Sequence, residues 1–231
     1  MPEGSLRERL IDVGVELVLT EGTASVGLRE IARRAGVSHG APRRYFSTHH
    51  ALLSAIAARG FDDLGARFAE ATADLSPPRA RIEALAKVYV RFALERRGMF
   101  ELMFRHDLLD SGQQVSGRPW LRAAALPLFE RVVDLVARCR AVDSADPADP
   151  AGPADPAAAP AVPSPQAGSA PATPSPHAVT AAAIWTNLHG LAQLWGWGSL
   201  QLALGVPEAS DDHLDRLVAA VMDAHLGPAA P

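Results

Sequence analysis

Cysteine and lysine are almost absent from this 231-residue sequence, which contains one of each, Cys139 and Lys87. A single cysteine excludes a disulfide framework within the chain and is typical of a protein kept in a reducing cytoplasm. Acidic residues slightly outnumber basic ones, and the formal net charge is -4. The chain as a whole therefore lacks the basic excess that is typical of nucleic-acid-binding proteins. Residues 1–60 differ, because they hold eight arginines against six acidic residues.

Motifs of common enzymes and metal sites are also missing. No G-x-S-x-G turn, glycine-rich phosphate loop or spaced set of metal ligands occurs in the sequence. Adjacent pairs such as His49-His50 cannot chelate a metal unaided, because neighbouring side chains on a helix point in different directions. The first residues are polar and charged and show no signal peptide. We expect a cytoplasmic protein without catalytic residues, metal or cofactor; an enzyme and a helical interaction module remain the alternatives.

Apolar residues recur at helical spacing along most of the chain, and no segment alternates like a half-buried strand. The sequence therefore predicts an all-α fold. We expect Ser5 and Ser76 to lie at the starts of helices and Gly98 to end one. The expected helices cover about residues 5–21, 28–35, 39–46, 48–74, 77–97, 99–109, 119–140, 178–204 and 211–225.

Two segments of the C-terminal half have unusual compositions. Residues 141–177 hold ten of the 19 prolines and four aspartates, with no Lys or Arg. Proline interrupts both helices and sheets, so we expect a disordered Pro/Ala-rich insertion there. Residues 178–207 contain no charged side chain. This stretch is long enough to span a membrane, but its polar residues and glycines favour a helix buried against a partner subunit.

Residues 28–46, LREIARRAGVSHGAPRRYF, are the most informative segment. Leu28, Ile31, Ala32 and Ala35 give a first short helix an apolar face, and Gly36 can end it in the left-handed conformation. Ser38 is then placed to cap a second helix that is too short and too polar to be a core element. One acidic residue of the segment, Glu30, stands against five arginines: Arg29, Arg33, Arg34, Arg43 and Arg44. This pattern indicates a helix-turn-helix that faces DNA.

Residues 6–61, which include this segment, resemble the tetracycline-repressor-like (TetR/AcrR) family of one-component transcription regulators. Two further segments, YVRFALERRGMFELMF and, far downstream, IWTNLHGLAQLW, also resemble this family. Together they resemble the subgroup whose ligand domain is marked by a Trp followed by His-Gly, here Trp185, His189 and Gly190. The resemblance implies a three-helix DNA-binding domain at 1–47 and a helical ligand-binding and dimerisation domain at 48–231. It also implies a homodimer, most readily a repressor, that pairs through its last two long helices. Such a dimer would contact a near-palindromic double-stranded DNA operator.

The resemblance also assigns roles to individual positions of the DNA-binding segment. The positions that read base edges in the family correspond to His39, Gly40, Ala41 and Arg44. Those that grip phosphates correspond to Arg29, Ser38, Arg43, Tyr45 and His49. The sequence departs from the family pattern at His49, where a lysine is frequent, and this change weakens one expected phosphate contact.

The candidate ligand-binding residues are aromatic residues, a methionine and a histidine of the C-terminal part. They are Phe100, Met103, Phe104, Trp120, Trp185, His189, Trp195 and Trp197. Residues of this kind at helical spacing belong more often to a core than to a pocket. Trp185 and His189 share a helix face, and we expect the imidazole to be satisfied by a neighbouring carbonyl rather than by a ligand. Few charges occur among the candidates, so the expected effector is hydrophobic or amphipathic.

Overall fold

A computed structural model describes residues 3–105, 119–144, 173–206 and 210–228, and regular structure within these ranges is helical throughout. Two of the elements, η1 and η2, are short 3₁₀ helices. The elements are α1 (Glu3–Glu21), η1 (Thr23–Ser25), α2 (Leu28–Arg34), η2 (Ala41–Arg44), α3 (His49–Ala71), α4 (Pro78–Glu95), α5 (Arg97–Phe104), α7 (Pro119–Ser144), α8 (Pro176–Gly196), α9 (Ser199–Leu204) and α10 (Asp211–Leu226). The predicted all-α fold is confirmed.

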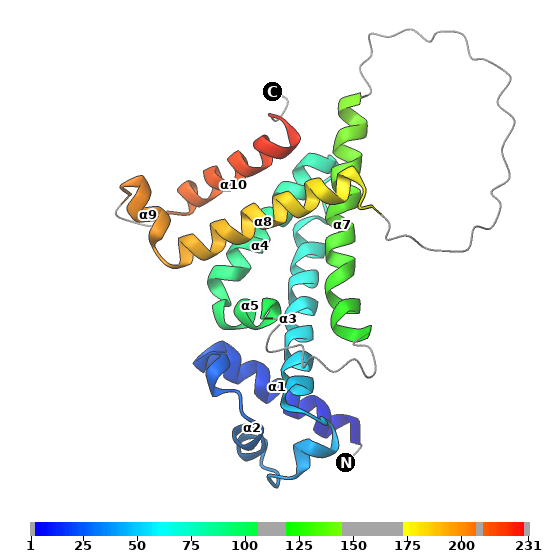
Figure 1. The fold of residues 1–231 in the computed structure, drawn as a ribbon, viewed down its shortest axis with the longest axis vertical. Helices are drawn as coiled ribbons and strands as arrows, with labels where there is room; N and C mark the ends of the chain where they lie inside the picture. The colour runs from blue at the N-terminus through cyan, green and yellow to red at the C-terminus, as the bar shows by residue number, and fades with distance from the viewer. Residues whose placement is uncertain (1–2, 106–118, 145–172, 207–209, 229–231) are drawn as a thin grey trace, which may run out of the picture.

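Helix α3 connects the two parts of the molecule. In Figure 1 it runs from the N-terminal cluster of α1, α2 and η2 into a larger body, where α4, α5 and α7 pack against it. The Thr48 side chain caps its start by accepting the backbone N–H of Ala51 at 3.0 Å. Its apolar stripe reaches the centre of the body, where Leu64 and Phe68 are buried. One continuous helix therefore extends from the N-terminal cluster to the core.

The first half of the expected helix-turn-helix forms as predicted. Helix α2 buries Ile31 and Ala32 completely, and Ala35 follows at its buried C-terminal end. Gly36 then adopts a φ of 67°, a left-handed conformation that glycine reaches without steric cost. The chain turns at once and continues toward η2.

The second half differs from the prediction, because residues 39–46 do not form an α-helix. They form turns and the short 3₁₀ helix η2, and the Ser38 side chain does not cap it. Pro42 explains the difference, since it has no N–H to donate to the carbonyl four residues earlier. It also biases the preceding residue, Ala41, away from the α conformation. The chain recovers one helical bond only after it, from the Phe46 N–H to the Pro42 carbonyl at 2.9 Å.

The expected insertion lies mostly outside the described residues, but both of its boundaries are corrected. Residues 141–144 continue α7, and α8 begins at Pro176 rather than at Ala178. Ser175 accepts the Ala178 N–H at 3.1 Å, and a proline at the first position of a helix loses no hydrogen bond. Residues 145–172, which hold eight of the ten prolines of the expected insertion, are among those not described.

Three other expected helix boundaries are wrong. Ser5 lies inside α1, and α4 begins after Pro77 with no side-chain cap. Gly98 lies inside α5, where it allows close approach to α1. The uncharged stretch forms two helices, α8 and α9, because Gly198 takes a φ of 77° between them. Within the described ranges, no helix is both long and apolar enough to cross a membrane.

Candidate nucleic-acid interface and ligand cavity

The turn around η2 presents its arginines on the surface. Pro42 is buried, and Phe46 is only 3% exposed, so these two residues fix the turn to the N-terminal core. Arg43 and Arg44 lie between them in sequence and are both exposed. The other candidate DNA contacts differ in exposure: Arg29, Ser38, His39, Gly40 and His49 are exposed, while Ala41 and Tyr45 are half-buried. Most of the predicted contact residues are therefore accessible on α2, on η2, on the turns beside them and at the start of α3.

The charge balance of this surface differs from the sequence-based expectation. Arg33 binds Glu30 at 2.6 Å, and Arg34 binds both Glu30 at 2.7 Å and Glu21. Hydrogen bonds from Arg33, and to a smaller extent from Arg34, lower the pKa of the Glu30 carboxyl to about 2. Two of the five arginines are therefore neutralised locally. Among the described residues, no carboxylate pairs with the other three: Arg29, Arg43 and Arg44.

His49 has a structural contact that the sequence did not predict. Its Nε2 lies 2.6 Å from the carbonyl oxygen of Val26, so the imidazole donates a hydrogen bond to the segment that precedes α2. This bond ties the start of α3 to the helix-turn-helix. Only Nδ1 then remains, and it can donate to a phosphate only when it also carries a proton, which makes His49 a weaker contact than a lysine would be.

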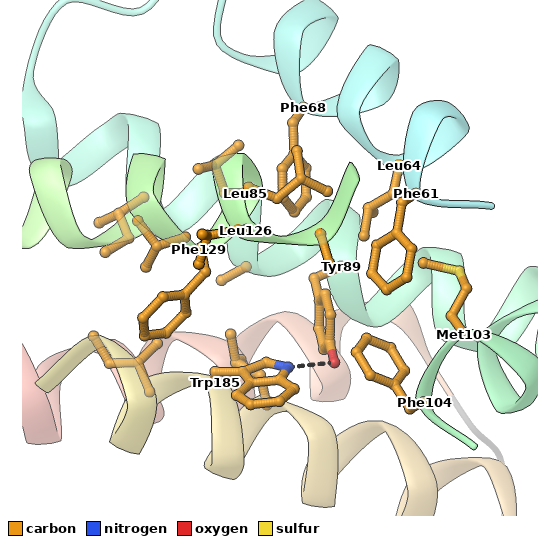
Figure 2. A pocket seen from close by; sticks show the side chains of 17 residues that line it. Phe61, Leu64, Phe68, Leu85, Tyr89, Met103, Phe104, Leu126, Phe129 and Trp185 are labelled. Atoms are coloured by element: carbon orange, nitrogen blue, oxygen red, sulfur yellow. Dashed lines mark hydrogen bonds between the residues drawn. The ribbon is translucent and has the colours of Figure 1, made fainter. Parts of the chain in front are cut away.

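An apolar cavity of about 420 Å³ lies in the body between α3, α4, α5, α7 and α8. Figure 2 shows its wall, with aromatic rings from several helices pointing inward. Its volume falls in the range of small-molecule sites. No charged side chain occurs among its described lining residues, which are Phe61, Leu64, Phe68, Ile82, Leu85, Ala86, Tyr89, Met103, Phe104, Ala125, Leu126, Leu128, Phe129, Val132, Ile184, Trp185 and Leu188.

One hydrogen-bonded triad supplies the polar groups at this wall. The Trp185 Nε1 donates to the Tyr89 hydroxyl at 2.8 Å, and that hydroxyl lies 2.9 Å from Nδ1 of His189. The indole only donates, so the tyrosine oxygen accepts there. If Nδ1 donated as well, the tyrosine proton would have no acceptor among the described residues of the apolar wall. We therefore assign that proton to a hydrogen bond with Nδ1, which places the imidazole proton on Nε2. Burial raises the pKa of Tyr89 and lowers that of His189, so both groups are held neutral. The predicted partner of His189, a carbonyl, is therefore corrected to a tyrosine hydroxyl.

The structure separates the predicted ligand-binding residues into groups. Met103, Phe104 and Trp185 line the cavity. Phe100 and His189 lie behind the wall, stacked on each other with ring centroids 5.0 Å apart. Outside the wall, Trp195 is a buried core residue, Trp197 is largely exposed, and the side chain of Trp120 lies outside the described residues.

Several cavity residues were missed by the sequence prediction, above all Tyr89 and Phe129. Apolar side chains at helical spacing look alike whether they fill a core or surround a void, so most of the wall carries no distinguishing signal. Tyr89 does carry a signal that the sequence could have shown. It is one of two tyrosines in the chain, and a tyrosine on a buried helix face needs a hydrogen-bond partner.

The depressed pKa of His189 predicts a pH-dependent stability. An unfolded chain takes up a proton at this residue near pH 6.5, whereas the folded state resists protonation, so acid should favour unfolding below that value. We expect the melting temperature to fall from about pH 7 to about pH 5 less steeply in His189→Gln than in the unmodified protein. His39→Gln, at an exposed site, is the control and should keep the original slope. Equal slopes in all three proteins would contradict the prediction.

Comparison with known proteins places both regions in one family. Residues 10–56 match the family model for bacterial regulatory proteins of the tetR family. Residues 82–221 match the tetracyclin repressor-like C-terminal domain. The first match contains α2 and η2, and the second contains Tyr89, Trp185 and His189 of the triad.

Individual relatives agree with these matches. The HTH-type transcriptional activator FasR of Mycolicibacterium smegmatis is 25% identical over 138 residues, which are 60% of this chain and 62% of FasR. The HTH-type transcriptional regulator BetI of Rhizobium meliloti is 33% identical over 85 residues, 37% of this chain and 42% of BetI. The matches therefore span less than two thirds of either relative.

Solved structures extend the comparison to nearly the whole chain. A protein of unknown function from Rhodococcus sp. RHA1 is 26% identical with a TM-score of 0.67, and the match covers 97% of this chain and 95% of that one. The TetR family transcriptional regulator PfmR from Thermus thermophilus is 14% identical with a TM-score of 0.57, covering 96% of this chain and 100% of PfmR. At that identity, the likeness to PfmR shows a shared fold alone.

Proposed function

This chain belongs to the tetR family of bacterial transcription regulators, and we propose that it is a dimeric repressor released from its DNA operator by a hydrophobic small molecule. The exposed pair Arg43 and Arg44, fixed on a turn whose Pro42 and Phe46 are buried, carries the DNA-binding part of the proposal. The apolar cavity carries the effector part. Residues 1–47 would contact DNA, and residues 48–231 would bind the effector and form the dimer.

The DNA contacts are assigned by the resemblance to the family, and the exposure of most of these residues supports the assignment. Arg44, together with His39, Gly40 and Ala41, would face base edges, because an arginine can bond two acceptors of a guanine at once. The phosphates on either side of those bases would be contacted by Arg29, Ser38, Arg43, Tyr45 and His49. Two such surfaces in one dimer would enter successive major grooves, so the operator should be a near-palindrome.

Two helices connect the cavity to the DNA-binding domain. Helix α3 lines the cavity with Phe61, Leu64 and Phe68, and at its other end His49 is bonded to Val26. Helix α5 contributes Met103 and Phe104 to the wall and lies against α1. An effector that pushes these side chains outward would therefore shift α3, change the spacing of the two DNA-binding surfaces and release the operator.

The dimer is proposed to form through α8 and α10. The outward face of α8 is uncharged and leaves apolar side chains in solvent, including Leu194 at 40% and Trp197, just beyond the helix, at 60% exposure. Gly190 lies on the same face with open space around it, which allows a second helix to approach closely. Exposed apolar surface of this kind is typical of a subunit interface.

We expect the double variant Leu194→Glu and Trp197→Glu to be monomeric. Two buried carboxylates facing their copies in the partner would cost more than the interface gains, whereas the subunit fold should hold because both side chains are exposed. Sedimentation equilibrium would measure the change. Val142→Glu is the control, since Val142 is equally exposed on α7 and should leave the dimer intact. A double variant that stays dimeric would place the interface elsewhere.

Regulation is tested with the DNA upstream of the protein's own reading frame. The purified protein should retard this fragment in a gel, and the retardation should weaken steeply as salt rises. Transcription from the same fragment in vitro should decrease when the protein is added, as a repressor requires. An increase would make it an activator, and no retardation of this fragment or of other promoter DNA would favour an interaction module without DNA binding.

A further inference from the structure

The cavity wall is unusually poor in groups that could stabilise a charged ligand. Along its described part, the side-chain polar atoms are the Tyr89 hydroxyl and the Trp185 indole nitrogen. A carboxylate or an ammonium group buried there would lose its hydration and gain no opposite charge, which is a large free-energy cost. The wall therefore selects against ligands whose charged group enters the cavity.

The hydrogen bonds of the triad leave one position open. The Tyr89 hydroxyl gives its proton to His189 and accepts one from Trp185, so two of its three hydrogen-bonding positions are taken by α8. A hydroxyl has a second lone pair, which remains available as an acceptor. Both protons of the wall, on Tyr89 and on Trp185, already have partners. The wall can thus accept a hydrogen bond from a ligand, but it has no free hydrogen-bond donor to offer to that ligand.

His189 keeps the Tyr89 oxygen available as an acceptor for a ligand. Its ring is stacked on Phe100 and lies edge-on to Phe104, at centroid distances of 5.0 and 5.1 Å. Nδ1 faces the tyrosine hydroxyl, and an imidazole whose proton is on Nε2 can only accept there. His189 is thus a positioning residue, because it holds the tyrosine proton toward α8 and leaves the remaining lone pair for a ligand.

We propose that the effector is an uncharged alcohol or phenol with an apolar body, whose hydroxyl donates a hydrogen bond to the Tyr89 oxygen. This inference depends on the proposed function, because it takes the cavity as the effector site. The apolar body contacts the aromatic wall, and the single hydroxyl fixes its orientation. A ketone or an ester of the same size binds less tightly, because its oxygen is an acceptor and faces another acceptor.

Three probes of matched length separate these chemistries: decanol as a donor, methyl nonanoate as a neutral acceptor and decanoate as an anion. Titration calorimetry at about pH 8, where a carboxyl is ionised, measures each dissociation constant. We expect methyl nonanoate to bind about three- to tenfold more weakly than decanol, which is the value of one neutral hydrogen bond. We expect decanoate to bind at least about a hundredfold more weakly, because its charge must be desolvated.

A tyrosine variant tests the anchoring atom. Tyr89→Phe should lower the affinity for decanol about three- to tenfold. The ester should bind at least as tightly as before, because the variant removes the opposing acceptor and frees the Trp185 N–H. Retained ester binding also shows that the cavity is intact in the variant. Tyr45→Phe, at the other tyrosine and outside the cavity, is the matched control and should bind decanol normally. If Tyr89→Phe does not fold, the order of the three probes on the unmodified protein still decides the proposal.

The outcomes distinguish this inference from the proposed function. If decanoate or methyl nonanoate binds as tightly as decanol, the donor-selective site is wrong, while the cavity remains an effector site. If decanol binds equally well to Tyr89→Phe, the hydroxyl is not anchored at Tyr89. If none of the three probes binds, both the inference and the assignment of the cavity as the effector site are contradicted.

Discussion

Replacing Arg43 and Arg44 together by alanine should nearly eliminate specific operator binding. A bidentate arginine–guanine contact at Arg44 is worth about 1–3 kcal/mol, and removal of the phosphate contact at Arg43 adds to it, so affinity should fall by about two to three orders of magnitude. Fluorescence anisotropy with a labelled operator at several salt concentrations would measure both effects. The salt slope should also decrease by about one for each phosphate that the variant no longer binds.

A third arginine of the same region provides the matched control. Arg33 is exposed like Arg43 and Arg44, but its guanidinium already binds Glu30. Arg33→Ala should therefore change operator affinity far less than the double variant does. If Arg33→Ala were equally damaging, general positive charge rather than the η2 turn would explain the binding.

Gly98→Ala should destabilise the protein where the two domains meet. A Cβ at this position would lie 2.5 Å from the Val18 carbonyl oxygen, which already accepts the Gly22 N–H at the end of α1. Backbone has to move to relieve this overlap, so we expect a loss of about 1–3 kcal/mol of unfolding free energy. Denaturant unfolding followed by circular dichroism would measure it.

Gly196→Ala is the control for the glycine variant. Gly196 is also helical, but its added Cβ would meet only the Leu94 side chain at an ordinary 3.5 Å, so stability should be unchanged or slightly higher. Because α5 also lines the cavity, Gly98→Ala should additionally reduce the ability of a bound effector to release DNA. A Gly98→Ala protein as stable as Gly196→Ala would show that α1 and α5 are not tightly packed there.

The parts of the fold that the sequence predicted well depend on local information. The spacing of Leu28, Ile31, Ala32 and Ala35 determines α2, and Gly36 ends it through its own conformational freedom. The α-helix predicted at residues 39–46 does not form, and this too has a local cause, because Pro42 interrupts the helical hydrogen bonds. Local features therefore predicted a turn after α2 that carries exposed arginines, and erred in the helix type that follows it.

The features that the sequence could not predict depend on contacts between distant segments. Glu21 lies thirteen positions before Arg34, and only the fold brings them together. Gly98 looks like a helix end, although its actual function is to let α5 touch the backbone of α1. The cavity is a property of how five helices leave space between them, so Tyr89 and Phe129 could not be separated from core residues by spacing alone.

Selection of bound sequences from random double-stranded DNA tests the central claim most directly. The account predicts an enriched near-palindrome whose half-site centres lie about one helical turn, roughly 34 Å, apart or slightly more. It also predicts that the protein with Arg43 and Arg44 replaced enriches no sequence. Enrichment of no motif by the unmodified protein, or of a single asymmetric site, would contradict a dimeric regulator that reads DNA through the η2 turn.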